Sequence, residues 1–280
     1  MVAGTETMNL SKDLLLKFLR AVLFGEKLDA SDFAEADWKS IFQLADEQTV
    51  SALLLDGMSL LPSECISIPL DDKLKRIATM QRIEQINRLH RKVIVKIDQA
   101  LKSEGIPVVF MKGQTTALRY PNPLHRTPGD IDFVVNPKDF KKTMEGLEKI
   151  GKVDHDLVHE HHGMAWVDGV TVEPHYKVHN YQSPSTDHAM QEMFASVFPS
   201  ELSSADMDGY AVPVFPPTFE SVFLISHMVN HVYEEGLGLR QVIDYAMFLS
   251  SCADKIDWLQ HHEYLHQMHM ERAWRIFTCI

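Results

Sequence analysis

Cysteine is scarce in this sequence: Cys65, Cys252 and Cys279 are the three that occur in 280 residues. Three cysteines far apart form neither a disulfide framework nor a zinc knuckle, and this usage is typical of a reducing compartment. The N-terminal MVAGTETMNL lacks the basic stretch followed by an apolar core that marks a secretory signal. We therefore expect a cytoplasmic protein.

Long apolar runs and excess positive charge are also lacking. No segment approaches the roughly 20 consecutive apolar residues that a membrane helix needs, so no membrane partner is expected. The chain has 27 Lys and Arg against 39 Asp and Glu, a formal net charge of −12. This charge gives no general attraction to phosphate, so long nucleic acid is not an expected partner. An apolar content of 45% allows a sizeable core in one large or two modest domains.

Residues 1–104 are expected to form an N-terminal helical region, because apolar residues recur there at helical spacing. The first helix should begin at its N-cap Ser11 and stop at Gly25. One continuous helix is expected over 37–61, where Pro62 ends it. A third helix is expected over 70–105.

Residues 105–182 are expected to form a small α/β unit. The β-rich apolar stretches 106–113 and 130–135 predict strands, and a helix is expected over 137–151. Within 162–178, the pair Asp168–Gly169 predicts a two-residue hairpin turn. Residues 183–280 again predict helices. The expected fold class is therefore α+β (mixed α/β): a small mixed sheet flanked by N- and C-terminal helical regions.

Two aspartates in the second predicted strand are the first candidate site. Asp130 and Asp132 would point to the same side of the strand, roughly 6.5–7 Å apart. This arrangement is costly unless a cation lies between them. Spacing alone is equally compatible with two solvent-facing residues at a strand end.

The hairpin adds a third carboxylate. Thr171, Glu173 and His175 share one face of its second strand. If this strand lies beside 130–135, Glu173 joins the two aspartates in an oxygen-rich site suited to Mg²⁺. Because Pro174 cannot donate a ladder hydrogen bond, we expect this strand to be at an edge or ending.

Other residues near the first strand suit phosphate. Gly113 ends that strand and allows backbone to approach a ligand closely. Lys112 and Arg126 bring positive charge to the same neighbourhood, where they would neutralise phosphate.

The combination MKG, RYPNPLHRTPGDIDFVV, VEPHYKV and LRQVIDYAMFL resembles the uncharacterised nucleotidyltransferase-like family of the DNA polymerase beta nucleotidyltransferase superfamily. The resemblance implies a nucleotidyltransferase-like core and transfer of a nucleoside monophosphate from an NTP to an acceptor. It implies that Asp130, Asp132 and Glu173 are catalytic and hold Mg²⁺, with Mn²⁺ as the alternative. The acceptor is open between a small molecule, an antibiotic-like compound, a protein and RNA.

The expected substrate-binding residues are Lys112, Gly113, Gln114, Arg126, His175 and Arg240, of which the resemblance implies Gly113 and Arg240. Gln114 stands where the superfamily usually has Ser, and Lys112 precedes the glycine. An alternative is therefore a non-catalytic nucleotide-binding or regulatory module with an altered glycine loop. Arg240 is four residues before Asp244, so a purely structural ion pair is the alternative for it.

Histidines are the last candidates. His155, His159, His161 and His162 lack the spacing of a known metal motif and are expected in a loop and strand start. His227 and His231 share a helix face, but Met228 excludes the H-E-x-x-H motif of zinc proteases. A packed pair is expected, and a metal-dependent hydrolase using His227, His231 and Asp244 is the second alternative function.

Overall fold

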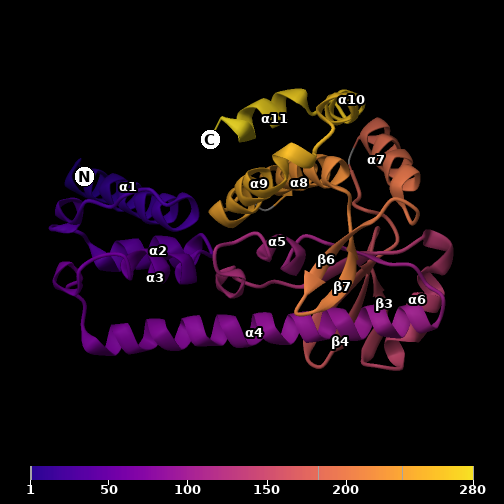
Figure 1. Ribbon diagram of the computed structural model, residues 1–280, viewed down its shortest axis with the longest axis horizontal. Coiled ribbons are helices and arrows are strands. Elements are labelled where there is room, and N and C mark those ends of the chain that lie inside the picture. The colour runs from indigo at the N-terminus through magenta and orange to yellow at the C-terminus, as the bar shows by residue number, and fades with distance from the viewer. Residues whose placement is uncertain (1, 182, 235, 280) are drawn as a thin grey trace. The chain divides into compact units, whose positions relative to one another are not determined.

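The computed structural model describes residues 2–181, 183–234 and 236–279, which form α-helices and one seven-stranded mixed sheet (Figure 1). The helices are α1 (Val2–Phe24), α2 (Trp38–Glu47), α3 (Ser51–Met58), α4 (Leu70–Ser103), α5 (Gln114–Ala117), α6 (Phe140–Glu148), α7 (Pro184–Val197), α8 (Pro217–Glu234), α9 (Leu239–Cys252), α10 (Trp258–Gln267) and α11 (Glu271–Thr278). The strands are β1 (Val109–Met111), β2 (Ile131–Val134), β3 (Lys152–Val158), β4 (Gly163–Val167), β5 (Val170–His175), β6 (Ser203–Met207) and β7 (Tyr210–Val214). The predicted mixed α/β class is confirmed.

The chain forms two compact units. The first combines Met1–Asn87, Ala117–Pro128 and Gly238–Ile243. The second combines Arg88–Thr116, Gly129–Leu237 and Asp244–Ile280, and it contains the whole sheet. Helices α4, α5 and α9 each begin in one unit and end in the other. The domain boundaries predicted at 104 and 182 stay a prediction.

The first unit packs α1, α2 and α3 around aromatic side chains. The ring centroids of Phe18 and Phe33 lie 4.4 Å apart, and Trp38 stacks on Phe33 with a centroid distance of 6.4 Å. A Cβ atom added to Gly57 on α3 would lie 2.7 Å from the Phe18 ring. The absence of a side chain there lets α1 and α3 approach closely.

Two helix predictions for this unit are wrong. Ser11 is not an N-cap, since it is buried inside α1, which begins at Val2. Residues 37–61 do not form one helix, because Thr49 adopts a left-handed conformation with φ of 55°. The Val50 amide then donates to the Ala45 carbonyl at 2.8 Å, the bond that closes a helix C-terminus. The break gives α2 and α3 separate directions in which to bury their apolar faces.

In the second unit, the strand order is β3-β4-β5-β2-β1-β7-β6. The two strands predicted over 106–113 and 130–135 are present as β1 and β2, and they are antiparallel neighbours. Strand β5 is parallel to β2 on the other side. The expectation that this strand is at an edge or ending holds in its second part: β5 lies between β4 and β2, but it ends at His175, one residue after Pro174. Pairing with β4 stops at Val172, so Pro174 lies where that ladder has ended.

The hairpin turn was predicted correctly, and three strands were not. Asp168 and Gly169 both have positive φ, 50° and 81°, and join β4 to β5. Strand β3 was expected to be mostly loop. The β6–β7 hairpin lies where only helices were expected, because its first strand, SSADM, is short and polar and lacks an apolar alternation. Its Asp208–Gly209 turn has the same conformation as the first, with φ of 55° and 90°.

Helices cover the sheet in the second unit. Helix α6 contacts β3, β4 and β5, while α7, α10 and α11 contact α8 (Figure 1). The core joins Val109 and Val134 of the sheet to Phe219 and Phe223 of α8 and to Phe248 of α9. Among the described helices, none is both long and apolar enough to cross a bilayer.

Candidate functional site

Carboxylates gather where β1, β2 and β5 lie side by side. In register, Asp132 of β2 faces Met111 of β1 on one side and Glu173 of β5 on the other. Ligand atoms of Asp132, Glu173 and His175 lie within 4.8 Å of one another. Among the described residues, this is the one group of three or more such side chains close enough to share a metal ion. These three residues are called the strand cluster.

Asp132 is the most buried member, with 1% of its side chain exposed. A buried carboxylate must be compensated by partners. The Lys112 Nζ lies 3.0 Å from Asp132 Oδ1, and the His175 Nε2 lies 3.0 Å from the same oxygen. Burial alone would lower the pKa of Lys112, but Asp132, Asp130 and Glu173 together raise it. Lys112 therefore stays protonated and supplies a positive charge beside the strand cluster.

Glu173 holds a proton to unusually high pH. Burial, together with the neighbouring carboxylates of Asp132 and Asp130, raises the pKa of Glu173 to about 8. Asp130 also shares a hydrogen bond with Glu173. Of the three predicted carboxylates, Asp132 and Glu173 thus lie opposite each other on β2 and β5. Asp130 is the residue before β2 and contacts Glu173 from there. Their predicted role as metal ligands stays a prediction.

Replacing Asp130 by Asn should lower the pKa of Glu173 and leave the metal-free protein no less stable. The change removes like-charge repulsion from a half-buried position. The raised pKa means that wild type loses stability as pH rises from 4.5 to about 8, and the variant should lose less. NMR titration of Glu173 and melts in chelator measure both effects. A metal-free variant that melts well below wild type would show Asp130 to be structural.

A tight backbone turn positions Lys112. Lys112 and Gly113 have φ of 50° and 55°, and the Thr115 hydroxyl donates to the Lys112 carbonyl at 2.8 Å. Gln114 is buried at the start of α5. The crevice between this turn and the ends of β1 and β2 has a volume of about 10 Å³. This is room for about one water molecule, so a triphosphate there requires Lys112 to move.

Histidines line the strand cluster, which the sequence did not predict. His162 Nδ1 lies 3.6 Å from Glu173 Oε2, and the His161 and His179 rings have centroids 5.1 Å apart. Burial lowers the pKa of His161 to about 3 and of His179 to about 4. Burial, with Lys112 nearby, also lowers the pKa of His175. These imidazoles are neutral at physiological pH and add no positive charge to the site.

Arg126 lies on a loop of the first unit. Its Nη1 donates to the Thr127 carbonyl at 3.3 Å, and its own carbonyl accepts from Asn87 Nδ2 at 2.8 Å. The preceding His125 contacts Asp56 Oδ2 at 2.6 Å and Glu84 Oε1 at 3.1 Å. Hydrogen bonds from the His125 ring to Asp56 and Glu84 raise the pKa of His125 despite its burial. These contacts favour the protonated imidazole and connect the loop that carries Arg126 to Asp56 and Glu84.

The His125 contacts predict that the first unit loses stability as pH rises. Because the pKa of His125 is higher in the folded than in the unfolded protein, its contacts stabilise the folded protein fully below about pH 6.5, the pKa of the unfolded state. This stabilisation is lost as pH rises through the pKa of the folded state. His125→Gln should cost about 1–3 kcal/mol at about pH 6 and much less at about pH 9. Urea unfolding at both pH values measures this, with the exposed His188→Gln as control. Equal losses at both values would contradict the charged form.

Arg240 and the His227–His231 pair have structural contacts. Arg240 Nη1 donates to the Thr127 carbonyl at 3.4 Å within the first unit. The Nε2 atoms of His227 and His231 lie 3.1 Å apart, in agreement with the expected packed pair. In the described parts of the chain, these histidines form no metal-binding group with Asp244. The phosphate-binding roles of Arg126 and Arg240 stay predictions.

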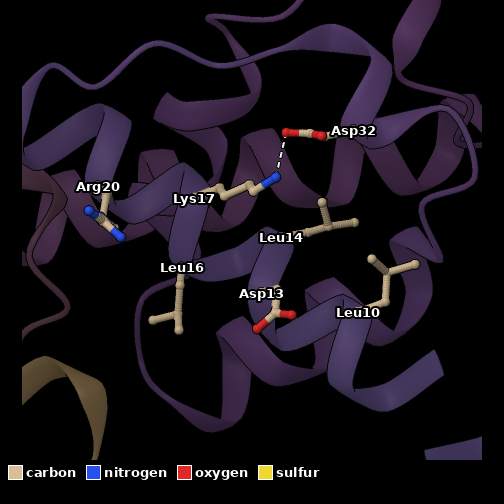
Figure 2. Close-up of a pocket in the computed structure, with 7 residues that line it drawn as sticks. All are labelled: Leu10, Asp13, Leu14, Leu16, Lys17, Arg20 and Asp32. Atoms are coloured by element: carbon tan, nitrogen blue, oxygen red, sulfur yellow. Dashed lines mark hydrogen bonds and ion pairs between the residues drawn. The ribbon is translucent and has the colours of Figure 1, made fainter. Parts of the chain in front are cut away.

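Larger cavities lie elsewhere in the described residues. One of about 750 Å³ in the second unit is lined by Tyr181, Asn230 and Arg272, among others. The Tyr181 ring lies 5.2 Å from that of His179, centroid to centroid. A groove of about 340 Å³ on α1 is lined by leucines and charged residues, and its Lys17 pairs with Asp32 (Figure 2).

Comparisons with solved structures give distant similarities. The antibiotic-resistance factor ANT(2'')-Ia in solution is 13% identical over 67% of this chain and 97% of that chain, with a TM-score of 0.44. ANT(2'')-Ia in complex with adenylyl-2''-tobramycin is also 13% identical, over 64% and 98% of the two chains, with a TM-score of 0.44. An antigenic nucleotidyltransferase-like protein from Paracoccidioides brasiliensis is 14% identical over 57% and 75%, with a TM-score of 0.39.

The family comparison covers most of the chain. No curated protein sequence matches it. The sequence profile of the family described as "Uncharacterised nucleotidyltransferase" matches residues 34–280, which include the second unit with the whole strand cluster and the part of the first unit that follows residue 33. The chain therefore belongs to the uncharacterised nucleotidyltransferase family.

Proposed function

We propose that the protein transfers a nucleoside monophosphate from an NTP to an acceptor with the help of a divalent cation. The observation that carries the proposal is the register of β2 and β5, which sets Asp132 opposite Glu173 with Asp130 hydrogen-bonded to Glu173. Three carboxyl groups on adjacent strands suit a hard cation. Membership of a nucleotidyltransferase family supports the reaction type.

Each residue of the site has a part in this proposal. Asp130, Asp132 and Glu173 would hold Mg²⁺, or Mn²⁺ in its place, and the cation would supply positive charge to the triphosphate during in-line attack. Lys112 leaves Asp132 and pairs with a phosphate. The backbone of Gly113 and Gln114 lies beside that phosphate. Arg126 and Arg240 are the further candidates for phosphate binding.

The test is cation-dependent release of pyrophosphate from each of the four common NTPs, with transfer of a label from the α-phosphate. Wild type should release pyrophosphate with Mg²⁺ or Mn²⁺ and stop in chelator. Asp132→Asn should be inactive. Asp254→Asn is the matched control, since it removes the same charge from an exposed position. Release that is independent of a divalent cation would contradict the proposal.

The acceptor in this proposal is a small molecule. The cavity of about 750 Å³ in the second unit has the volume of small-molecule sites, and the net charge of −12 disfavours long RNA. Incubation of the protein with a metabolite extract and an isotopically labelled NTP should give a small product that carries the nucleoside monophosphate. Label recovered on protein or RNA instead would contradict this choice.

The second candidate is a non-catalytic nucleotide-binding module. The occupied state of the site favours it: the Lys112 ammonium is paired with Asp132, and the crevice beside it has a volume of only about 10 Å³. Under this alternative, NTP raises the melting temperature by mass action, yet no pyrophosphate appears with any acceptor. The same melts and assays therefore separate the two functions.

A further inference from the structure

His175 differs from the other members of the strand cluster, because it presents an imidazole nitrogen, whose lone pair can bind a cation, to the carboxylates. Glu173 and His175 are two residues apart on β5 and so share one face of the sheet. We propose that His175 Nε2 is a ligand of the catalytic cation, together with Asp132 and Glu173, and that the site prefers Mn²⁺ or a later transition metal to Mg²⁺. This inference rests on the proposed function, which supplies the cation.

The distances suit one ion. Two adjacent ligands of an octahedral ion with bonds of about 2.1 Å are about 3.0 Å apart. His175 Nε2 lies 3.0 Å from Asp132 Oδ1 and 3.8 Å from Glu173 Oε2. The three donors can therefore surround a cation once the Lys112 ammonium, which lies 3.0 Å from the same Asp132 oxygen, has moved away. No change in the register of β2 and β5 is needed.

The protonation of His175 also permits ligation. The Nε2 must give up its proton to bind a cation, and the proton can then reside on Nδ1. His175 is 3% exposed, and its Nδ1 has no hydrogen-bond partner in the structure. Moving the proton to Nδ1 therefore breaks no second hydrogen bond, but it leaves a buried Nδ1–H without an acceptor, a cost that the bond to the cation must exceed. The one bond lost, from Nε2 to Asp132, is replaced by the bond to the cation.

The neighbouring His162 is a poorer ligand. Its Nδ1 lies 3.6 Å from Glu173 Oε2 but 3.1 Å from the Gly163 carbonyl, to which an Nδ1–H donates. His162 is thus held at the side of the strand cluster. A carboxylate-only site suits Mg²⁺, whereas an imidazole ligand favours transition metals, whose affinities rise along the divalent series from Mn²⁺. The single nitrogen of His175 therefore decides the preference.

The test is pulsed electron paramagnetic resonance of Mn²⁺ bound to the wild-type protein. A directly bonded imidazole nitrogen-14 modulates the electron spin echo, and wild type should show this modulation. It should vanish in His175→Gln, which keeps the side chain's bulk and polarity, and persist in His162→Gln. Competition dialysis should give wild type at least tenfold preference for Mn²⁺ over Mg²⁺, and His175→Gln should lose most of it.

The outcomes separate this inference from the proposed function. Mn²⁺ that binds in an Asp132-dependent manner without nitrogen modulation would overturn the role of His175 and leave the catalytic cation intact. Modulation that survives in His175→Gln would assign the nitrogen elsewhere and also overturn it. Mn²⁺ that fails to bind wild type would remove both proposals. The wild-type spectrum is informative by itself, so the test does not depend on the variant's folding.

Discussion

Asp132→Asn should reduce nucleotidyl transfer by about 10³-fold or more, since a catalytic cation contributes several kcal/mol and each 1.4 kcal/mol is about tenfold in rate. Asp132 faces Glu173 and receives Lys112 and His175 at 3.0 Å each. No other described carboxylate makes all of these contacts. The variant should therefore lose cation binding as well as activity.

The same change should destabilise the metal-free protein. It leaves the Lys112 ammonium without its closest anion, at a cost of about 1–3 kcal/mol. Asp130→Asn should have no such cost, because Asp130 is half-buried and its removal relieves repulsion. Rates, cation titrations and melts of the two variants give this contrast directly. Equal stability losses in both would contradict the distinct roles of the two aspartates.

Local patterns were sufficient to predict the strands that carry the carboxylates. The D-x-D stretch is short, apolar and β-rich, and the Asp168–Gly169 turn fixes the register of the hairpin. Placing Glu173 beside Asp132 additionally required β5 to pair with β2. The family resemblance supported that long-range choice, and residue spacing alone left it open.

The position of His162 beside His175 follows from the same hairpin register. The turn pairs Val167 with Val170 and Ala165 with Val172. Continuing this register pairs His162 with His175, which is the bridge that the structure contains. The register of the hairpin therefore predicts this bridge, but the HDLVHEHHG stretch lacks an apolar alternation and was expected to form a loop and a strand start.

Other features depend on tertiary packing. Thr49 ends a helix although a β-branched residue at positive φ is unfavourable, because the break lets α2 and α3 both bury apolar residues. The polar strand β6 is an edge strand stabilised by pairing with β7. Neither feature follows from periodicity, since in both cases contacts with distant segments outweigh local preference.

Lys112→Met should have opposite effects on cation binding and on catalysis. In the metal-free site, the Lys112 ammonium lies 3.0 Å from Asp132 and competes with a metal ion for the same oxygen. Removing that charge should tighten cation binding about tenfold or more, because the cost of displacing an ammonium from a nearly buried carboxylate disappears. NTP turnover should fall about 10²-fold or more, because a charge that stabilises the phosphate is lost.

Stability should also depend on the cation in this variant. Without metal, Asp132 keeps His175 but loses its cationic partner, so Lys112→Met should melt below wild type. A divalent cation should restore more stability to the variant than to wild type, by mass action. Lys96→Met is the matched control, since Lys96 pairs with Asp168 in the same unit and is more exposed. Calorimetric titrations and melts across cation concentrations measure both effects. If Lys112→Met binds the cation no more tightly than wild type, the ammonium and the metal do not share Asp132, and the cation site lies elsewhere.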